Sequence, residues 1–227
     1  MIVVDGGPVA NLSGTSLAAR PELAGVVLKD VTRPFMIKLL GGGKITGTIQ
    51  DRVVRESGGT LDFYYRVFND ASSTGTGPLG TNIPNIEAVI RRNIPVGISS
   101  DVDWRTDGLG EIAPTTSSRG GQTAVGFSFA TTLKPGDESR FFFVKTNAKS
   151  YNAKGNVTVS GGVDIGDITI ITTFQPVKQK ITGPLPLGRK GKKTNQTKRR
   201  QKPASSKSKQ SKRSSRQKTR MPRRPSK

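Results

Sequence analysis

Seventeen lysine and arginine side chains stand between residues 189 and 224, with no acidic residue among them. Cations at this density bind phosphates or other anionic groups along a polymer, because binding releases the polymer's condensed counterions. We expect them to attach the protein to a polyanion, such as nucleic acid or an anionic cell-surface polymer. The predicted polyanion-binding residues are Arg189, Lys190, Lys192, Lys193, Lys198, Arg199, Arg200, Lys202, Lys207, Lys209, Lys212, Arg213, Arg216, Lys218, Arg220, Arg223 and Arg224.

The positive charge is confined to one end of the chain. Residues 178–227 hold 12 Lys and 8 Arg without an Asp or Glu, whereas residues 1–177 hold 17 basic and 16 acidic residues. Such a partition predicts a near-neutral domain over 1–177 and a polycationic tail over 178–227. The tail is too polar to offset its ordering entropy, so we expect it to be disordered. Without an aromatic residue to stack on bases, it should attach non-specifically.

Catalytic and metal chemistry have few candidates, because the chain contains neither His nor Cys. Four acids, Asp101, Asp103, Asp107 and Glu111, superficially resemble a calcium loop. Their register fails, since Arg105 and Thr106 occupy the fifth and sixth positions counted from Asp101, where a ligand and a glycine are needed. We expect these acids to form turns. The sequence therefore predicts a protein that is not an enzyme and that holds neither metal nor cofactor.

The elements of residues 1–177 read as β almost throughout. Residues 44–55 and 61–68 flank the turn 56–60 and predict a hairpin, and the second run alternates as in a half-buried strand. We predict further strands at 23–31, 35–40, 87–94, 102–105, 125–129, 139–146, 156–160 and 168–174, with loops at 69–82 and 107–121. Short strands between Gly- and Pro-rich turns predict a single all-β domain, an antiparallel β-sandwich of jelly-roll-like type.

Two groups of residues predict which strand faces of this domain are buried and which face solvent. Phe141–Phe143 is a consecutive apolar triple and must point to both faces of its strand, which predicts a strand buried on both sides. A second group consists of four arginines in residues 1–177, which could extend the basic surface of the tail onto the sandwich: Arg52, Arg55, Arg91 and Arg92. Because nearby acids balance them, we expect these four to be ordinary solvent-facing strand residues.

Four stretches, taken in order, resemble a known group of proteins. They are SLAARPELAGVVLKD, RVVRESGGTLDFYYRVFNDASS, DVDWRTDGLGEIAPTTSSR and LKPGDESRFFFVKTNAKSY. Over about residues 16–175 the chain resembles a group of uncharacterised bacterial extracellular β-sandwich domains, many of which occur with a PEP-CTERM sorting signal. The resemblance implies a secreted or surface-associated sandwich and assigns no catalytic residue. Residues 1–14 show no secretory signal and the tail replaces the sorting signal, so a cytoplasmic location is the alternative.

Three functions are compatible with these observations. The first is a non-enzymatic binding or structural protein whose tail attaches a β-sandwich to a polyanion. The second is a jelly-roll coat or packaging protein with a genome-binding basic arm. The third is a secreted carbohydrate-binding or hydrolase-like domain. No apolar run reaches the ~18 residues of a transmembrane helix, so we expect no membrane span, and the oligomeric state stays open.

Overall fold

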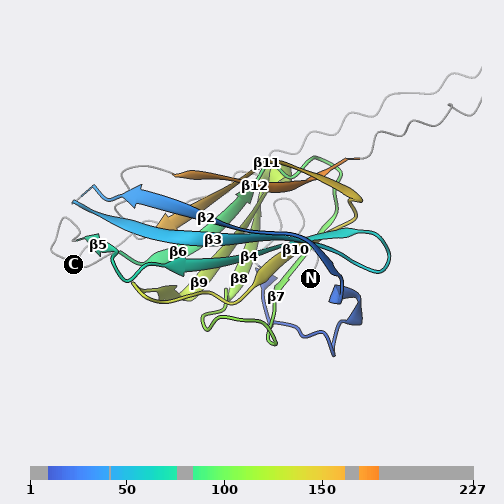
Figure 1. Ribbon diagram of the computed structural model, residues 1–227, viewed down its shortest axis with the longest axis horizontal. Helices are drawn as coiled ribbons and strands as arrows, with labels where there is room; N and C mark the ends of the chain where they lie inside the picture. The colour runs from blue at the N-terminus through green and yellow to red at the C-terminus, as the bar shows by residue number, and fades with distance from the viewer. Residues whose placement is uncertain (1–9, 41, 76–83, 162–168, 179–227) are drawn as a thin grey trace, which may run out of the picture. The chain divides into compact units, whose positions relative to one another are not determined.

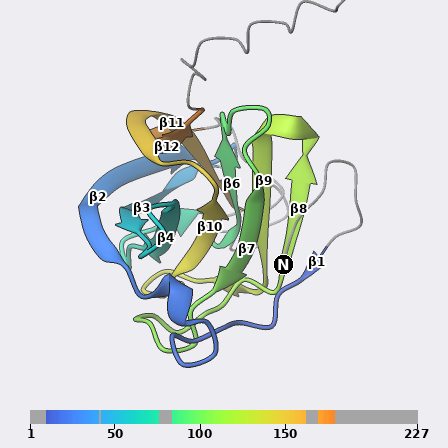
Figure 2. The same ribbon diagram turned by 90° about the vertical axis from the view of Figure 1, so that its right-hand side faces the viewer.

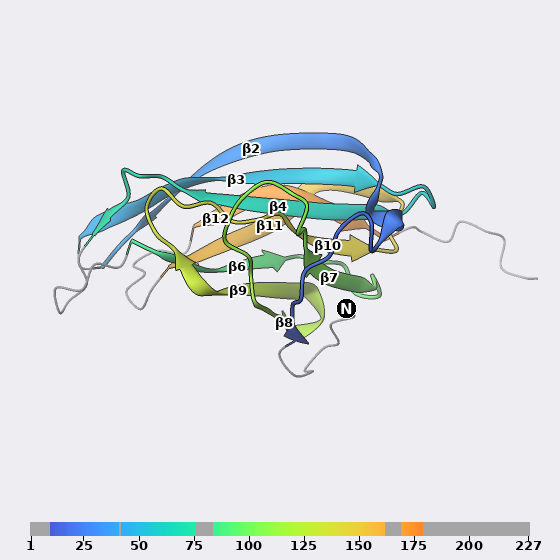
Figure 3. The same cartoon turned by 90° about the horizontal axis from the view of Figure 1, so that it is seen from below.

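The computed structural model describes residues 10–40, 42–75, 84–161 and 169–178, and this part of the chain is all-β, as predicted (Figure 1). Its strands form two antiparallel sheets, which lie one above the other in Figure 3. Besides strands, the described residues contain two single-turn 3-10 helices, η1 (Pro21–Leu23) and η2 (Gly121–Thr123). None of the helices in this part of the chain is long and apolar enough to cross a membrane. The predicted tail lies outside the described residues.

The first sheet has a long hairpin at one edge and a short strand at the other. In spatial order it consists of β2 (Val26–Lys38), β3 (Gly43–Arg55), β4 (Leu61–Asn69), β10 (Phe142–Thr146) and β7 (Ser100–Trp104), with β5 (Thr74–Gly75) paired to β3. The late strand β10 lies between the early strands β4 and β7.

The second sheet repeats this interleaving. In spatial order it consists of β1 (Ala10–Asn11), β8 (Thr116–Gly120), β9 (Ala124–Leu133), β6 (Ile86–Arg92), β11 (Ser150–Gly161) and β12 (Ile170–Val177). The early strand β6 lies between β9 and β11. In both sheets, strands that are far apart in the sequence thus lie side by side, which gives the jelly-roll-like sandwich that the sequence predicts (Figure 2).

The predicted hairpin is present as β3 and β4. Its turn contains Gly59 at φ 82°, a left-handed conformation that glycine adopts without strain. The inward side chains of β3 include Ile45, Ile49 and Val53, all fully buried between the sheets. The outer face of β4 is not solvated, however, because Asp62 and Tyr64 are buried as well. The predicted half-buried strand is therefore covered on both faces in its first half.

Several predicted segments differ from the structure; the predicted loop at 69–82, for example, contains the two-residue strand β5. The separate strands at 23–31 and 35–40 are one strand, β2, which continues through Pro34. Since β2 is an edge strand, a proline costs it no hydrogen bond where its nitrogen faces away from the sheet. The predicted loop at 107–121 contains β8, which lacks apolar residues and is held by backbone pairing with β9.

Two hydrophobic clusters explain the phenylalanine triple. The larger fills the space between the sheets and includes Phe142, whereas Phe141 and Phe143 belong to a smaller cluster on the outer face of the first sheet. We call this smaller cluster the outer cluster; its members are Leu23, Val54, Tyr64, Phe141 and Phe143. Leu23 belongs to η1, so the chain segment before β2 supplies the cover. The prediction that both faces of this strand are buried is confirmed.

Arg91 corrects the prediction for the four body arginines. Its side chain is only 1% exposed and lies between the sheets. Its guanidinium donates to the backbone oxygens of Arg92, Asn156 (3.0 Å) and Phe174 (3.1 Å). The prediction of a solvent-facing side chain is wrong here, because a count of charges along the sequence does not show which face of a strand each one occupies.

Candidate functional site

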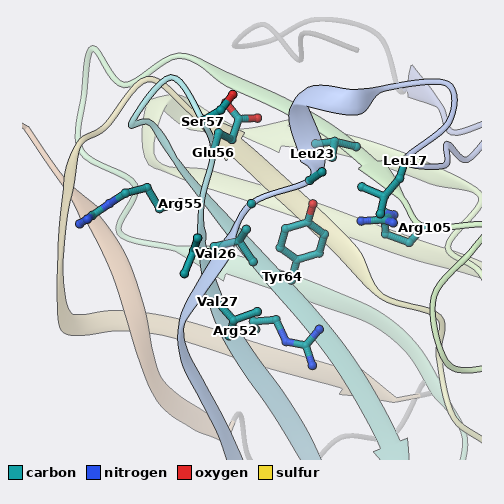
Figure 4. Close-up of a pocket in the computed structure, with 13 residues that line it drawn as sticks. Leu17, Leu23, Val26, Val27, Arg52, Arg55, Glu56, Ser57, Tyr64 and Arg105 are labelled. Carbon is teal, nitrogen blue, oxygen red and sulfur yellow. The ribbon is translucent and has the colours of Figure 1, made fainter.

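A cavity of about 600 Å³ opens on the outer face of the first sheet, beside the segment that leads through η1 into β2 (Figure 4). We call it the Tyr64 groove. Its apolar lining includes Leu17, Leu23, Val26, Val27 and Val54, and its polar lining includes Arg52, Arg55, Glu56, Tyr64 and Arg105. A smaller hollow of about 310 Å³ shares Arg52, Tyr64 and Arg105 with it. The sandwich thus presents a hollow with mixed apolar and cationic walls.

The β3–β4 register builds the floor of this groove. Arg52 pairs with Tyr64 and Val54 pairs with Asp62, which places all four side chains on the outer face. The opposite wall comes from the segment 17–27, which crosses that face and continues into the first residues of β2. A hollow remains beside β2 because this segment covers the outer cluster but does not fill the face completely.

Three aspartates hold this crossing segment against the sheet. Asp103 accepts from the backbone N–H of Gly14 at 2.9 Å, and Asp107 accepts from that of Leu17 at 2.8 Å. Asp101 accepts from the Arg20 guanidinium at 2.7 Å. The fourth member of the predicted turn cluster, Glu111, is exposed and does not join them. In the described ranges there is no group of three acids able to hold a metal ion.

Tyr64 is the most unusual side chain of the groove. Only 3% of it is exposed, and within the described residues its hydroxyl has no hydrogen-bond partner. Burial, aided by the charge of Asp62, raises the pKa of this phenol, so the hydroxyl stays protonated and remains a donor. In Figure 4 the hydroxyl points toward Leu23, with Arg105 beside it. A buried donor without an acceptor is costly, and a bound ligand could supply the acceptor.

Arg52 and Arg105 stand on either side of Tyr64, and each is held by one aspartate. Arg52 donates to Asp30 through Nε (3.0 Å) and Nη2 (2.7 Å) and stacks over Phe141 at 4.5 Å from the ring centroid. Arg105 contacts Asp107 through Nε and Nη2, both at 2.7 Å. Each guanidinium is therefore fixed along one edge, which positions it without using all of its donors.

A charged row crosses the same face next to the groove. Asp62 on β4, Lys145 on β10 and Asp101 on β7 are cross-strand neighbours, so the lysine lies between two aspartates. Lys145 contacts Glu56, whose other oxygen accepts from Thr60 Oγ1 at 2.6 Å. Both Glu56 and Asp62 are buried.

Asp62 is the acid of this row whose pKa departs most from its ordinary value. Burial, together with the neighbouring charge of Glu56, raises the pKa of Asp62 to about 8. Glu56 lines the groove, but Asp62 is fully buried and does not line it.

The seventeen predicted binding residues of the tail, from Arg189 to Arg224, all lie outside the described residues and stay a prediction. The groove was missed by sequence reasoning, because its walls come from segments far apart in the chain. One signal was available. Tyr64 stands on the face of β4 that the alternation assigns to solvent, and a large aromatic there requires a cover.

Comparison of the chain with family models, with curated proteins and with solved structures gives no match. The resemblance to the bacterial extracellular domains accordingly stays a prediction. Any functional statement must rest on the residues and their geometry.

Proposed function

We propose that this protein is a non-enzymatic binding protein whose C-terminal lysines and arginines attach a β-sandwich to a polyanion, either nucleic acid or an anionic cell-surface polymer. The observation that carries the proposal is the charge partition: 20 basic residues and no acid over 178–227. A net charge concentrated at one end directs that end to an anionic polymer.

The contacts within the sandwich support the proposal that the tail, and not the sandwich, binds the polyanion. Its arginines are largely engaged with the sandwich itself, as for Arg20 with Asp101, Arg33 with Asp51 and Arg66 with Glu138. Arg91 is buried on backbone oxygens. Charges that are paired or buried release few counterions on meeting a polyanion, so the tail must supply most of the attraction.

The test replaces tail cations in the full-length chain. A variant in which Arg189, Lys190, Lys192, Lys193, Lys198, Arg199, Arg200 and Lys202 become Gln is titrated with random-sequence duplex DNA and with heparin at several salt concentrations. If ~10 phosphates are neutralised, log K should fall with log salt at a slope of about −9. We expect the variant to show a shallower slope and an affinity at least tenfold lower for both polymers.

The matched control exchanges Lys and Arg at the same eight positions, which keeps the charge. Its salt slope and affinity should equal those of the unaltered chain, because non-specific attachment depends on charge rather than on side-chain shape. Unchanged binding after neutralisation would overturn the proposal. A preference for DNA over heparin that survives high salt would assign the binding to the sandwich.

The jelly-roll-like interleaving of the sheets favours one second candidate, a coat or packaging protein in which many copies assemble around nucleic acid. Light scattering of the full chain separates the two. A coat protein should form particles of defined size when nucleic acid is added, whereas an attachment protein should form complexes whose mass follows the length of the polymer.

A further inference from the structure

The Tyr64 groove has the size and lining of a small-molecule site. Its volume of about 600 Å³ falls within the ~300–1,000 Å³ typical of such sites. Large apolar side chains around it remain open to solvent, with Val26 69%, Val27 49% and Leu17 38% exposed. An apolar ligand body would cover surface that the sandwich itself leaves uncovered.

The charges that line the groove favour an anion. Three arginines and one glutamate, Glu56, contribute to the lining, and Glu56 is already paired with Lys145. Asp30 and Asp107, which hold Arg52 and Arg105, do not line it. Both guanidiniums contact these aspartates through Nε and Nη2.

The Tyr64 hydroxyl indicates where the anion would lie. It is a buried donor without an acceptor, and it lies beside the Arg105 guanidinium (Figure 4). A carboxylate accepts several hydrogen bonds and could meet both donors at once. A sugar is less suited, because the aromatic side chains here, Tyr64 and Phe141, are at most 4% exposed and offer no face for stacking.

We propose that the Tyr64 groove binds a small amphipathic carboxylate. Its carboxylate accepts from Tyr64 and Arg105, and its apolar chain lies against Leu17, Leu23 and Val27. This goes beyond the attachment function of the tail, since it gives the sandwich a ligand of its own. The protonated phenol and the guanidinium bind the anionic head, while the exposed aliphatic side chains bind the tail of the ligand.

The experiment uses the full-length ¹⁵N-labelled chain and three probes: decanoate below its micelle concentration, decanol below its solubility limit, and acetate. Amide shifts report where each probe binds, so contact with tail cations is distinguished from contact with the groove. We expect decanoate to shift the amides of residues 17–27 and 64, with an affinity about tenfold higher than decanol because of hydrogen bonds to a charged group. Acetate, which lacks the apolar body, should leave these amides unchanged.

Two variants test the head-group contacts. Tyr64→Phe removes only a hydroxyl without a partner and should fold normally, yet lower decanoate affinity about tenfold and leave decanol binding unchanged. Arg105→Lys keeps a charge near Asp107 but loses the planar fork, and we expect a smaller decrease. Arg92→Lys, on the second sheet, is the control and should have no effect.

The proposal is overturned if decanol binds as tightly as decanoate, if Tyr64→Phe leaves decanoate affinity unchanged, or if no probe shifts the groove amides. If the tail failed to bind DNA or heparin, the expected results for decanoate, for decanol and for Tyr64→Phe would not change. The two proposals can therefore fail separately.

Discussion

Two buried aspartates on opposite faces of the first sheet have been accommodated in different ways. Asp51 on β3 faces the space between the sheets, where its Oδ2 accepts from the backbone N–H of Phe174 at 2.9 Å and from Arg33 at 3.2 Å. Asp62 on β4 faces the outer cluster, and neither of its oxygens has a donor among the described residues. Both aspartates are fully buried.

The difference lies in the charge of the neighbours. Burial raises the pKa of both carboxyl groups, but for Asp51 the hydrogen bond from Phe174 and the charges of Arg33 and Arg91 oppose the rise. For Asp62 the charge of Glu56 adds to it, and Lys145 opposes it only in part. The groups around Asp51 in the inter-sheet core thus favour its ionised form, whereas Glu56 beside Asp62 on the outer face favours the protonated form. We expect the first arrangement to fix the fold and the second to make the outer face sensitive to pH.

The largest effect should come from removing the cation of the inter-sheet core. Arg91→Met keeps much of the side-chain volume but leaves the backbone oxygens of Asn156 and Phe174 without this donor, and it removes one of the two positive charges near Asp51, the other being Arg33. Breaking a buried charged network in this way costs about 3–5 kcal/mol of the free energy of unfolding. Urea denaturation followed by far-UV circular dichroism measures it.

The next residue provides the matched control. Arg92 is exposed, so Arg92→Met should change the free energy of unfolding by no more than ~0.5 kcal/mol. Equal losses in the two variants would show that the contacts of Arg91 do not stabilise the core.

On the outer face, Asp62→Asn should change the pH dependence of stability. The folded pKa of about 8 lies above the unfolded value near 3.8, so the folded state binds the extra proton between these limits. The contribution of Asp62 is complete below about pH 4 and is lost as the pH rises to about 8. The variant should equal the natural chain at pH 4 and be the more stable of the two at pH 8.5, by at most ~5 kcal/mol.

Thermal unfolding of both chains is measured at several pH values. The difference between their free energies of unfolding at each pH isolates the contribution of Asp62 from that of the other acids. Glu87→Gln, at an exposed position of β6, is the control and should give a flat difference. A flat difference for Asp62→Asn would mean that this carboxyl group is ionised in the folded protein.

A smaller effect is expected where the backbone makes room for Arg91. At the bulge of β11, a Cβ added to Gly155 would stand 2.5 Å from Arg91 Nη2 and 2.8 Å from the Phe174 oxygen. Gly155→Ala must therefore displace the guanidinium, at about 1–3 kcal/mol. Gly58→Ala is the control, because its Cβ would have no neighbour within 4 Å. Similar melting temperatures for both variants would contradict the close packing of Arg91.

Much of the fold could be predicted, because strands that bury one apolar face show it by alternation. Ile45, Ile49 and Val53 follow this rule, and the triple Phe141–Phe143 correctly indicates burial on two sides. β8 could not be found, since backbone pairing with β9 holds it and the side chains of Thr116–Gly120 carry no apolar pattern.

The groove and the buried charges were beyond the sequence for a different reason. Burial of Arg91 and Asp62 depends on which face each occupies and on what covers that face, and both follow from contacts between distant segments. Leu23 covers Tyr64 across about forty residues of chain. One signal for a cover was present in the sequence. The face of β4 that the alternation assigns to solvent carries the large aromatic Tyr64 beside Asp62, and such a face needs another segment over it.

The smallest effect should come from the rim of the groove, where the outer face meets solvent. Arg52→Lys keeps the charge near Asp30 but loses the second hydrogen bond and the planar contact with Phe141. Because both members of the pair are partly exposed, water screens their attraction, and we expect a loss of about 0.5 kcal/mol in urea denaturation. Arg55→Lys, an exposed neighbour on the same strand, should be neutral. A loss for Arg52→Lys as large as that for Arg91→Met would mean that the outer face stabilises the fold as strongly as the inter-sheet core, and the distinction between the two faces would fail.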